Sequence, residues 1–412
     1  MRLLVYSHDA YGLGNIRRML AICESLLKDI PGLSILLLSG SPMVQSFRLP
    51  KGLDYIKLPC LNRGETGNIA TKYLQTDSDQ IIQLRSDLIL SAAVHFKPDL
   101  FLVDKKPFGL QNEIKKTVKY LRSWCPKTKI VLLLRDILDA PAKTMAEWQK
   151  TGFHAAVEKY YDQLLVVGSP EVFDFVQEYR LPPAIANKVK FCGYMGRPQG
   201  RQDRSAIRQE LQVLPEERLV VVTPGGGEDG YPMIHNYLLG LKLLPANHNI
   251  KSLIISGPEM SVAEREKLSE MAEQYPHVQM VEFTDDLISY LAAADTIVSM
   301  GGYNTICEIL SAQKPAVVIP RVRPSQEQLV RAEKMTQLGL FKAVHPDQLN
   351  PDSLIQTLLQ QLSNQRGTMA AIKQLNLDAL PQITCQIYDL VNQTLPFKPA
   401  LKSELVPMAI AA

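Results

Sequence analysis

The feature that most constrains the fold of this chain is a regular alternation of short apolar runs with longer amphipathic stretches. In the first half, the runs are RLLVYS (2–7), SILLLS (34–39), DLFLVD (99–104), KIVLLL (129–134) and QLLVVG (163–168). Amphipathic segments such as 16–29 and 109–124 lie between them, and we predict that they are helices. Because each run is almost continuously apolar, it suits a strand that is covered on both faces, as in a parallel sheet. The pattern therefore predicts an α/β, doubly wound fold.

The same alternation starts again in the second half of the chain. Its apolar runs are RLVVVT (218–223), SLIIS (252–256), TIVSM (296–300) and PAVVIP (315–320). Between the two series lies the segment 191–204, which is rich in Gly, Pro and Arg and which we interpret as an interdomain linker. We therefore predict one domain at residues 1–195 and a second at 196–382. A single large Rossmann sheet is the competing interpretation.

Composition narrows the class of protein. A chain of 412 residues can form two domains with full cores, and 46% hydrophobic and 21% charged residues are typical of a globular protein. The net charge of +3 is too small to indicate nucleic acid binding. The six cysteines are scattered, so neither a disulfide framework nor a zinc site is expected. Neither a signal peptide nor an apolar run of about 18 residues is present, and we expect a cytoplasmic protein.

The most informative motif is VSMGGYNTICEI, at residues 298–309. Gly301 and Gly302 permit a tight turn between a strand end and a helix start, where backbone N–H groups can hold a diphosphate. Asn304 and Thr305 fall on the first turn of this helix. Glu308 lies one turn further in, where a carboxylate can accept hydrogen bonds from the two hydroxyls of a ribose.

A second segment, PSQEQLVRAEKM at residues 324–335, places Glu327 and Gln328 side by side. This acceptor-rich pair suits the hydroxyls of a sugar ring. A diphosphate, a ribose and a sugar together describe a nucleotide sugar, which we predict to be the ligand.

The segment TPGGGEDG, at residues 223–230, is the strongest glycine cluster of the chain. It directly follows an apolar run, and Gly225, Gly226 and Gly227 let backbone N–H groups converge on phosphate oxygens. Gly257 ends the next apolar run and is expected to line the same crevice. A plain turn would rarely need three consecutive glycines.

The loop HDAYGLGNIRR, at residues 8–18, follows the first predicted strand. Gly12 and Gly14 stand at its strand-to-helix turn, but they do not complete a dinucleotide fingerprint. No acidic residue caps the second run at 34–39 either. These absences argue against NAD or FAD, and we predict no cofactor.

Together these segments resemble the two-Rossmann (GT-B) glycosyltransferases, most closely the group with the UDP-GlcNAc transferase of lipid II synthesis and the plastid galactolipid synthases. The resemblance covers residues 5–18, 223–230 and 283–335. It implies two Rossmann-like domains with an interdomain cleft, the N-terminal one taking a hydroxyl acceptor and the C-terminal one a UDP-linked sugar. It also implies that 383–412 contain a helix that crosses back to the N-terminal domain, followed by a tail.

The resemblance also bears on single residues of the donor site. In these relatives the first glycine loop carries a histidine that has been proposed as the base or as an acceptor contact. Here Asn15 takes its place, and an amide cannot accept a proton. We include Gly14 and Asn15 among the predicted donor contacts. Phe283 is a further one, because the relatives offer backbone atoms to the nucleobase near the position of Phe283.

Three other groups are candidates for the catalytic base. His8 ends the first predicted strand and belongs to the residue type that titrates near neutral pH. Asp9 is adjacent to it in the sequence. Asp104 lies at the carboxyl end of another strand, where open α/β sheets bind their ligands.

Polar residues at two strand ends are candidate acceptor contacts. Lys105 follows Asp104, and Arg135 and Asp136 follow the run at 129–134, although an ion pair that fixes the loop is an equal alternative. The next predicted helix presents a basic face, made by Lys115, Lys119 and Arg122. This face is merely solvated, or it is an acceptor mouth or a patch that touches anionic lipid headgroups, as lipid-modifying relatives use. The resemblance implies that the acceptor is a lipid or polysaccharide precursor, reached at the inner face of a membrane.

We find no convincing DxD at a strand end, which predicts a reaction without a bound metal. In that mechanism the glycine loop 225–227 offsets the charge that builds on the β-phosphate, while a carboxylate or histidine deprotonates the acceptor. Two other classes of protein stay open. One is a UDP-GlcNAc 2-epimerase, which has the same fold and donor site. The other is a non-catalytic partner with a degenerate donor site, to which Asn15 lends some weight.

Overall fold

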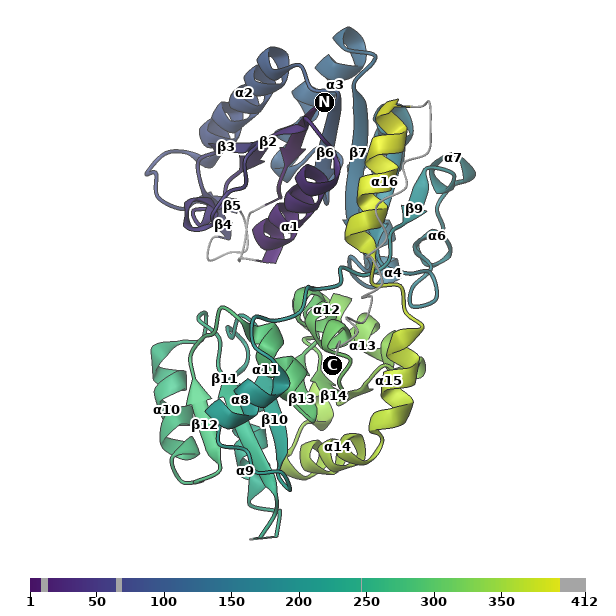
Figure 1. Cartoon of the computed structure of the whole chain (residues 1–412). Helices are drawn as coiled ribbons and strands as arrows, with labels where there is room; N and C mark the ends of the chain where they lie inside the picture. The colour runs from purple at the N-terminus through teal and green to yellow at the C-terminus, as the bar shows by residue number, and fades with distance from the viewer. Residues whose placement is uncertain (9–13, 64–68, 246, 393–412) are drawn as a thin grey trace, which may run out of the picture. The chain divides into compact units, whose positions relative to one another are not determined.

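The computed structural model describes residues 1–8, 14–63, 69–245 and 247–392 of the chain (Figure 1). Two parallel sheets, each flanked by helices, account for most of these residues. The predicted α/β class with two Rossmann-like sheets is therefore confirmed.

The first sheet has seven strands in the order β3-β2-β1-β6-β7-β8-β9. Its strands are β1 (Arg2–Tyr6), β2 (Ser34–Ser39), β3 (Leu53–Lys57), β6 (Leu100–Asp104), β7 (Lys129–Arg135), β8 (Gln163–Val167) and β9 (Val189–Phe191). The associated helices are α1 (Gly14–Asp29), α2 (Ser78–Phe96), α3 (Lys115–Trp124), α4 (Pro141–Thr151), α5 (Phe153–Tyr160), α6 (Phe175–Glu178) and α7 (Pro183–Ala186). A separate antiparallel pair joins β4 (Leu61–Arg63) to β5 (Ile69–Thr71).

The second sheet has six strands in the order β12-β11-β10-β13-β14-β15. Its strands are β10 (Arg218–Thr223), β11 (Ile250–Ile255), β12 (Val278–Val281), β13 (Thr296–Met300), β14 (Ala316–Ile319) and β15 (Lys342–Ala343). The helices of this part are α8 (Arg204–Glu210), α9 (Tyr231–Leu241), α10 (Val262–Ala272), α11 (Leu287–Ala293), α12 (Tyr303–Ala312), α13 (Glu327–Gln337), α14 (Pro351–Ser363) and α15 (Gln365–Lys373). Helix α16 (Ala379–Asn392) ends the described chain.

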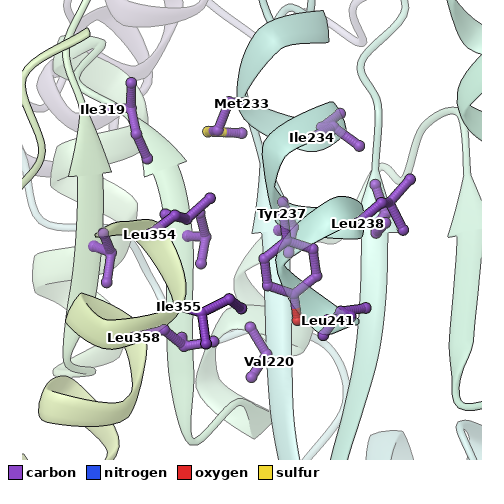
Figure 2. Close-up of a cluster of buried hydrophobic side chains, with 14 of the residues drawn as sticks. Val220, Met233, Ile234, Tyr237, Leu238, Leu241, Ile319, Leu354, Ile355 and Leu358 are labelled. Atoms are coloured by element: carbon purple, nitrogen blue, oxygen red, sulfur yellow. The ribbon is translucent and has the colours of Figure 1, made fainter. Parts of the chain in front are cut away.

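The hydrophobic core of the second sheet lies between its strands and helices α9 and α14 (Figure 2). Gly240 lets these two helices approach each other, because a Cβ atom there would overlap the side chain of Ile355. The hydroxyl of the buried Tyr237 is hydrogen-bonded to that of Ser252 at 2.7 Å, so its polar group is satisfied inside the core. This core holds the strand ends that carry the predicted ligand site.

All nine predicted strands are present, with ends that differ by at most two residues. The strands that the sequence did not predict are the short ones at sheet edges and in the separate pair, namely β3, β4, β5, β9 and β15. Edge strands are covered less, and the alternating exposure of β12 is an example. They therefore lack the continuous apolar run that marks a central parallel strand.

The helix predicted at 109–124 is wrong in its first turn. Leu110–Asn112 form a short 3-10 turn, and the α-helix begins only at Lys115. Gln111 and Asn112 have left-handed φ values of 48° and 63°, which a right-handed helix cannot contain. The tertiary reason lies in β1, because the hydroxyl of Tyr6 accepts a hydrogen bond from the backbone N–H of Leu110 at 2.9 Å.

The described chain divides into two compact units. The first comprises the described parts of Met1–Leu132, Tyr160–Gln163 and Leu380–Ala412, and the second comprises Leu133–Lys159 and Leu164–Ala379. In this division residues 133–159 and 164–195 belong to the second unit, although β8 and β9 are strands of the first sheet. Helix α16 is part of the first unit, where Nε2 of Gln163 donates to Oε1 of Gln386 at 2.7 Å. Among the described helices, none is both long and apolar enough to cross a membrane.

Candidate functional site

The motif at 298–309 forms the end of β13, a two-glycine turn and the start of α12. Gly302 is the N-cap residue, and the helix begins at Tyr303. The first N–H groups of a helix have no acceptor within it, so they are available to an anion. The turn needs Gly301 for reasons of space rather than of backbone angle, because a Cβ atom there would lie 3.2 Å from Cβ of Gln328.

Three predicted ligand residues follow on α12. Thr305 is largely buried, whereas Asn304 and Glu308 are half-buried. Oδ1 of Asn304 accepts a hydrogen bond from Nη2 of Arg197 at 3.2 Å. The backbone N–H of Arg197 in turn donates to Oγ of Ser311 at 2.9 Å, so a guanidinium is fixed beside the start of the helix. This cation adds to the electrostatic attraction of the helix terminus for a phosphate.

The glycine cluster at 225–227 follows β10 and reaches the same helix. A Cβ atom on Gly225 would lie 3.0 Å from Oγ1 of Thr305, which brings this loop against the first turn of α12. Gly225 and Gly227 have positive φ values of 84° and 102°, so the backbone itself requires glycine there. Gly257 packs against this loop, because a Cβ atom on it would overlap the carbonyl of Gly226.

An acidic side chain also lies beside this loop. A Cβ atom on Gly226 would overlap the carboxylate of Glu259, and the backbone N–H of Glu259 donates to the carbonyl of Gly226 at 2.8 Å. Because this carboxylate repels anions, a phosphate here would have to lie on the side of the loop that faces Thr305.

Phe283 lies at the edge of the second sheet, just after β12. Its side chain is 49% exposed, and it lines a cavity of about 490 Å³ together with Thr284 and Tyr290. The hydroxyl of Tyr290 donates to Oε1 of Glu210 at 2.7 Å. Burial raises the pKa of Tyr290 to about 12, and the neighbouring carboxylate adds to that shift. The phenol therefore stays neutral at physiological pH.

Glu327 and Gln328 open helix α13, and both side chains are already engaged. The carboxylate of Glu327 pairs with Nη1 of Arg135 at 3.2 Å. Oε1 of Gln328 accepts a hydrogen bond from the backbone N–H of Arg321 at 3.0 Å. The NH₂ group of Gln328 is therefore the part of this amide that can address a ligand, so the pair is less rich in acceptors than the sequence suggests.

Asp136, a predicted acceptor contact, is only 1% exposed and belongs to a buried ion pair. Nε and Nη2 of Arg331 each donate to one of its carboxylate oxygens at 2.8 Å. The hydroxyl of Tyr194 donates to the same carboxylate at 3.1 Å. Burial alone lowers the pKa of Arg331, but the charge of Asp136 and its hydrogen bonds outweigh this and raise that pKa well above its ordinary value. Asp136 therefore forms an ion pair that holds a loop, which was the alternative to the predicted acceptor contact.

The predicted catalytic groups of the first unit gather at the carboxyl ends of β1 and β6. His8 is largely buried, and its backbone N–H donates to Oδ2 of Asp104 at 3.3 Å. Nδ2 of Asn15 donates to the carbonyl of His8 at 2.8 Å. Oδ1 of Asp104 accepts a hydrogen bond from Nη2 of Arg18 at 2.7 Å, and both side chains of this ion pair are buried. The charge of Asp104 is thus already compensated.

The remaining predicted residues are less informative. Asp9 lies outside the described residues. Gly14 is the first residue of α1, and Lys105 is half-buried with a positive φ of 71°. Within the described part of the chain, no three His, Cys, Asp or Glu side chains lie together as metal ligands would. That the reaction needs no bound metal stays a prediction.

Sequence reasoning missed three arginines that organise these sites, namely Arg18, Arg197 and Arg331. Arg331 carried the clearest signal, because it stands four residues after Glu327, among apolar residues. Nothing in the local sequence names its partner Asp136, which lies 195 residues away.

Comparisons with known proteins identify a similar domain family and similar folds. Residues 220–386 match the model of the Glycosyltransferase family 28 C-terminal domain. An uncharacterized glycosyltransferase of Methanopyrus kandleri, MK0977, is 26% identical over 199 residues, which cover 48% of this chain and 53% of the relative. The UDP-N-acetylglucosamine--N-acetylmuramyl-(pentapeptide) pyrophosphoryl-undecaprenol N-acetylglucosamine transferase of Haemophilus influenzae is 22% identical over 196 residues, or 45% of this chain and 54% of the relative. The chain thus spans about half the length of these curated relatives.

A crystal structure of MurG from Acinetobacter baumannii has the same fold. It superposes with a TM-score of 0.60 at 15% identity, over 95% of this chain and 99% of MurG. The chain therefore has the GT-B fold, and the resemblance predicted from its sequence is confirmed.

Proposed function

We propose that this protein is a glycosyltransferase that moves a sugar from a UDP-linked donor to a hydroxyl acceptor. The observation that carries the proposal is the meeting of two glycine turns at one helix start, where Gly225 lies against Thr305. This contact lies within residues 220–386, which match a glycosyltransferase domain. The choice of UDP is supported by the name of the Haemophilus influenzae relative.

In this proposal the donor lies along the carboxyl ends of the second sheet. Backbone N–H groups of Gly225 to Gly227 and of the first turn of α12 hold the diphosphate, and Glu308 accepts hydrogen bonds from the ribose. The nucleobase of the donor lies near Phe283, beside the cavity that this residue lines. Gly301, Gly302 and Gly257 keep the backbone close to the ligand.

The same groups support the chemistry of transfer. As the bond between sugar and diphosphate breaks, negative charge grows on the leaving oxygen, and fixed N–H donors stabilise it without reorganisation. We propose His8 or Asp9 as the base that takes the proton of the acceptor hydroxyl. Asp104 is better suited to orient His8, because its own charge is neutralised by Arg18.

The proposed base can be tested by substitution. His8→Ala should lower kcat/KM by about 10²–10⁴-fold while UDP binding stays intact. A variant within a few-fold of the wild type would move the role to Asp9. Lys150→Ala, at an exposed position of α4, provides a control.

Glu327 and Gln328 are the proposed readers of the sugar. Gln328→Ala should change the preference among nucleotide sugars more than the affinity for free UDP, because the amide meets hydroxyls and not the nucleotide. Equal loss of both would show that Gln328 acts on the nucleotide or on the fold.

The experiment that tests the whole proposal is a screen of nucleotides and nucleotide sugars. Calorimetry with UDP, GDP and ADP should show binding of UDP first, and a protein that binds none would be a degenerate partner instead. Release of UDP from the donor should then require an added acceptor. Conversion of the donor sugar without any acceptor would indicate an epimerase.

We further propose a lipid-linked acceptor reached at the cytoplasmic face of an anionic membrane. Leu84 and Leu88 are exposed side chains of α2, and Lys115 and Lys119 are exposed on the adjacent helix α3. Such an apolar and basic surface suits anionic headgroups over an acyl layer. All six cysteines are free thiols, which suits a reducing compartment.

Sedimentation with lipid vesicles tests this surface. Binding should be stronger to vesicles of phosphatidylglycerol than to those of phosphatidylcholine, and should weaken as salt screens the charges. The double variant Leu84→Gln/Leu88→Gln should lose it, whereas Leu359→Gln on α14, another exposed leucine, should not. Equal binding of both variants would remove α2 from the contact.

A further inference from the structure

Arg331 of α13 is the most deeply buried cation of the proposed donor site. Its side chain has no exposed surface, and it donates to both carboxylate oxygens of Asp136 at 2.8 Å. Its remaining amino group, Nη1, donates to the backbone carbonyl of Gly301 at 3.0 Å. One guanidinium therefore connects the loop after β7 with the glycine turn that opens α12.

The surroundings allow this guanidinium little freedom. Its carbon lies 5.5 Å from the centre of the Tyr303 ring, and the hydroxyl of Tyr303 donates to the carbonyl of Val167 at 3.0 Å. Asp136 packs against Gly168, where any Cβ atom would overlap it. The hydroxyl of Tyr194 holds the same carboxylate. Aspartate, arginine and both tyrosines are thus fixed by several contacts each.

The partners of Arg331 belong to two parts of the proposed donor site. Gly301 precedes the N–H groups that would hold the diphosphate. The carboxylate of Glu327, a proposed reader of the sugar, lies 3.9 Å from Nη2 of Arg331. We propose that Arg331 is a positioning residue, which touches no substrate but sets the turn at Gly301 and the orientation of Glu327. This inference rests on the proposed function, because it needs a donor at that turn.

The chemistry explains why an arginine stands here. A guanidinium is planar and can donate to a carboxylate through two N–H groups and to a carbonyl through a third, whereas an ammonium is a compact point charge. A purely structural ion pair would stabilise the protein without changing its affinity for the ligand. The bond to Gly301 distinguishes the two roles, because its loss frees the backbone that faces the diphosphate.

A double variant separates positioning from stability. Removing one partner leaves a buried charge uncompensated, but replacing both by apolar residues of similar size is often tolerated. We expect Asp136→Leu/Arg331→Met to fold with a melting temperature near that of the wild type. Its affinity for UDP, measured by calorimetry, should nevertheless be about tenfold to a hundredfold weaker, since small misplacements in a site cost that much.

The pair formed by Arg85 and Glu113 provides a matched control. It is equally buried, with Nη2 of Arg85 donating to Oε1 of Glu113 at 2.7 Å, but it belongs to the first unit. Arg85→Met/Glu113→Leu should leave UDP affinity unchanged. If the wild type binds UDP and the folded double variant of Asp136 and Arg331 binds it equally well, the positioning role is wrong.

Two further outcomes stay distinct. A wild type that binds no UDP contradicts the proposed function itself rather than this inference. If the double variant fails to fold, Arg331→Lys takes its place, because lysine keeps the charge but cannot hold both Asp136 and Gly301. A tenfold weaker affinity for UDP is then expected, and an unchanged affinity in this folded variant would overturn the inference.

Discussion

Two aspartates at strand ends show how strongly burial decides the role of a single residue. Asp104 and Asp136 both stand where parallel strands place their ligand residues, yet each is paired with an arginine from a helix. A buried carboxylate without a partner would be very costly. Their charges are therefore compensated by these ion pairs, which is why we propose His8 rather than Asp104 as the catalytic base.

A substitution of Asp104 tests this assignment. Asp104→Asn leaves the charge of Arg18 buried and uncompensated, so we predict a loss of about 3–5 kcal/mol in the free energy of unfolding. Denaturant titration measures it, and Asp87→Asn, at an exposed pair, should change little. A variant of Asp104 with normal stability but without activity would instead identify this carboxylate as the base.

Glu308 is the residue on which the nucleotide assignment depends most. If it accepts hydrogen bonds from the ribose, Glu308→Ala leaves ligand hydroxyls without a charged acceptor. Such a loss costs roughly 1.5–3 kcal/mol, or about tenfold to a hundredfold in affinity for UDP. Calorimetry measures this, with Glu270→Ala on the exposed face of α10 as the control. Unchanged affinity in the folded variant would remove Glu308 from the site.

At the scale of elements, the glycine loop 225–227 after β10 and the loop at Gly257 after β11 pack against each other. Gly257 has a φ of 87° and touches the carbonyl of Gly226. Gly257→Ala should therefore weaken UDP binding and lower stability, through backbone overlap as well as strain. Gly339 also has a positive φ, of 73°, but lies in open space. Gly339→Ala should show only the conformational cost of about 1–2 kcal/mol.

Thermal unfolding and UDP calorimetry distinguish these effects. Equal behaviour of the two alanine variants would mean that the loops at Gly257 and Gly226 do not press against each other.

Another element-scale prediction concerns the segments that lead into β11 and β12. The rings of His248 and His277 meet edge to face with centroids 4.2 Å apart. Burial lowers the pKa of both, and for His277 the neighbouring His248 lowers it further. Both imidazoles therefore bind a proton less tightly in the folded protein than in the unfolded chain. Their contribution to stability is complete above a pH of about 6.5 and is lost as the pH falls below that value.

We therefore predict that the free energy of unfolding falls between about pH 7.5 and about pH 5.5, and falls less in His277→Gln. Denaturant titrations at the two pH values measure the difference. His95→Gln, at an exposed position of α2, should keep the pH dependence of the wild type. An equal fall in all three proteins would assign the effect to other groups.

At the scale of the whole molecule, the first compact unit is built from segments far apart in the chain, and helix α16 lies in one of them. Helix α16 brings Ile383 and Ile387 into that unit, and both side chains are fully buried. The stability of the N-terminal residues should therefore depend on a helix almost 400 positions away along the chain (Figure 1).

Ile387→Ala tests this dependence. Loss of a buried isoleucine side chain should cost about 2–5 kcal/mol in the free energy of unfolding. Leu359→Ala, at an exposed position of α14, should cost far less. Urea unfolding compares the two, and similar values would contradict the burial of α16.

Prediction from sequence succeeded where the local pattern carries the information. The central strands are covered on both faces, so their runs are apolar throughout, as in the run at 129–134. The edge strand β9 was missed because none of its three residues is fully buried. The start of α3 was misplaced because Tyr6, distant in sequence, imposes left-handed residues there.

The sequence by itself determined the α/β class and the glycine turns, because these depend on periodicity and on short spacings. It also supplied the residues that we propose to bind a nucleotide sugar. Only the tertiary structure decided which charges are available. Asp104 with Arg18, and Asp136 with Arg331, are brought together by the meeting of strand ends and helices far apart in the chain. A buried charge takes its role from its partner, and no local pattern names that partner.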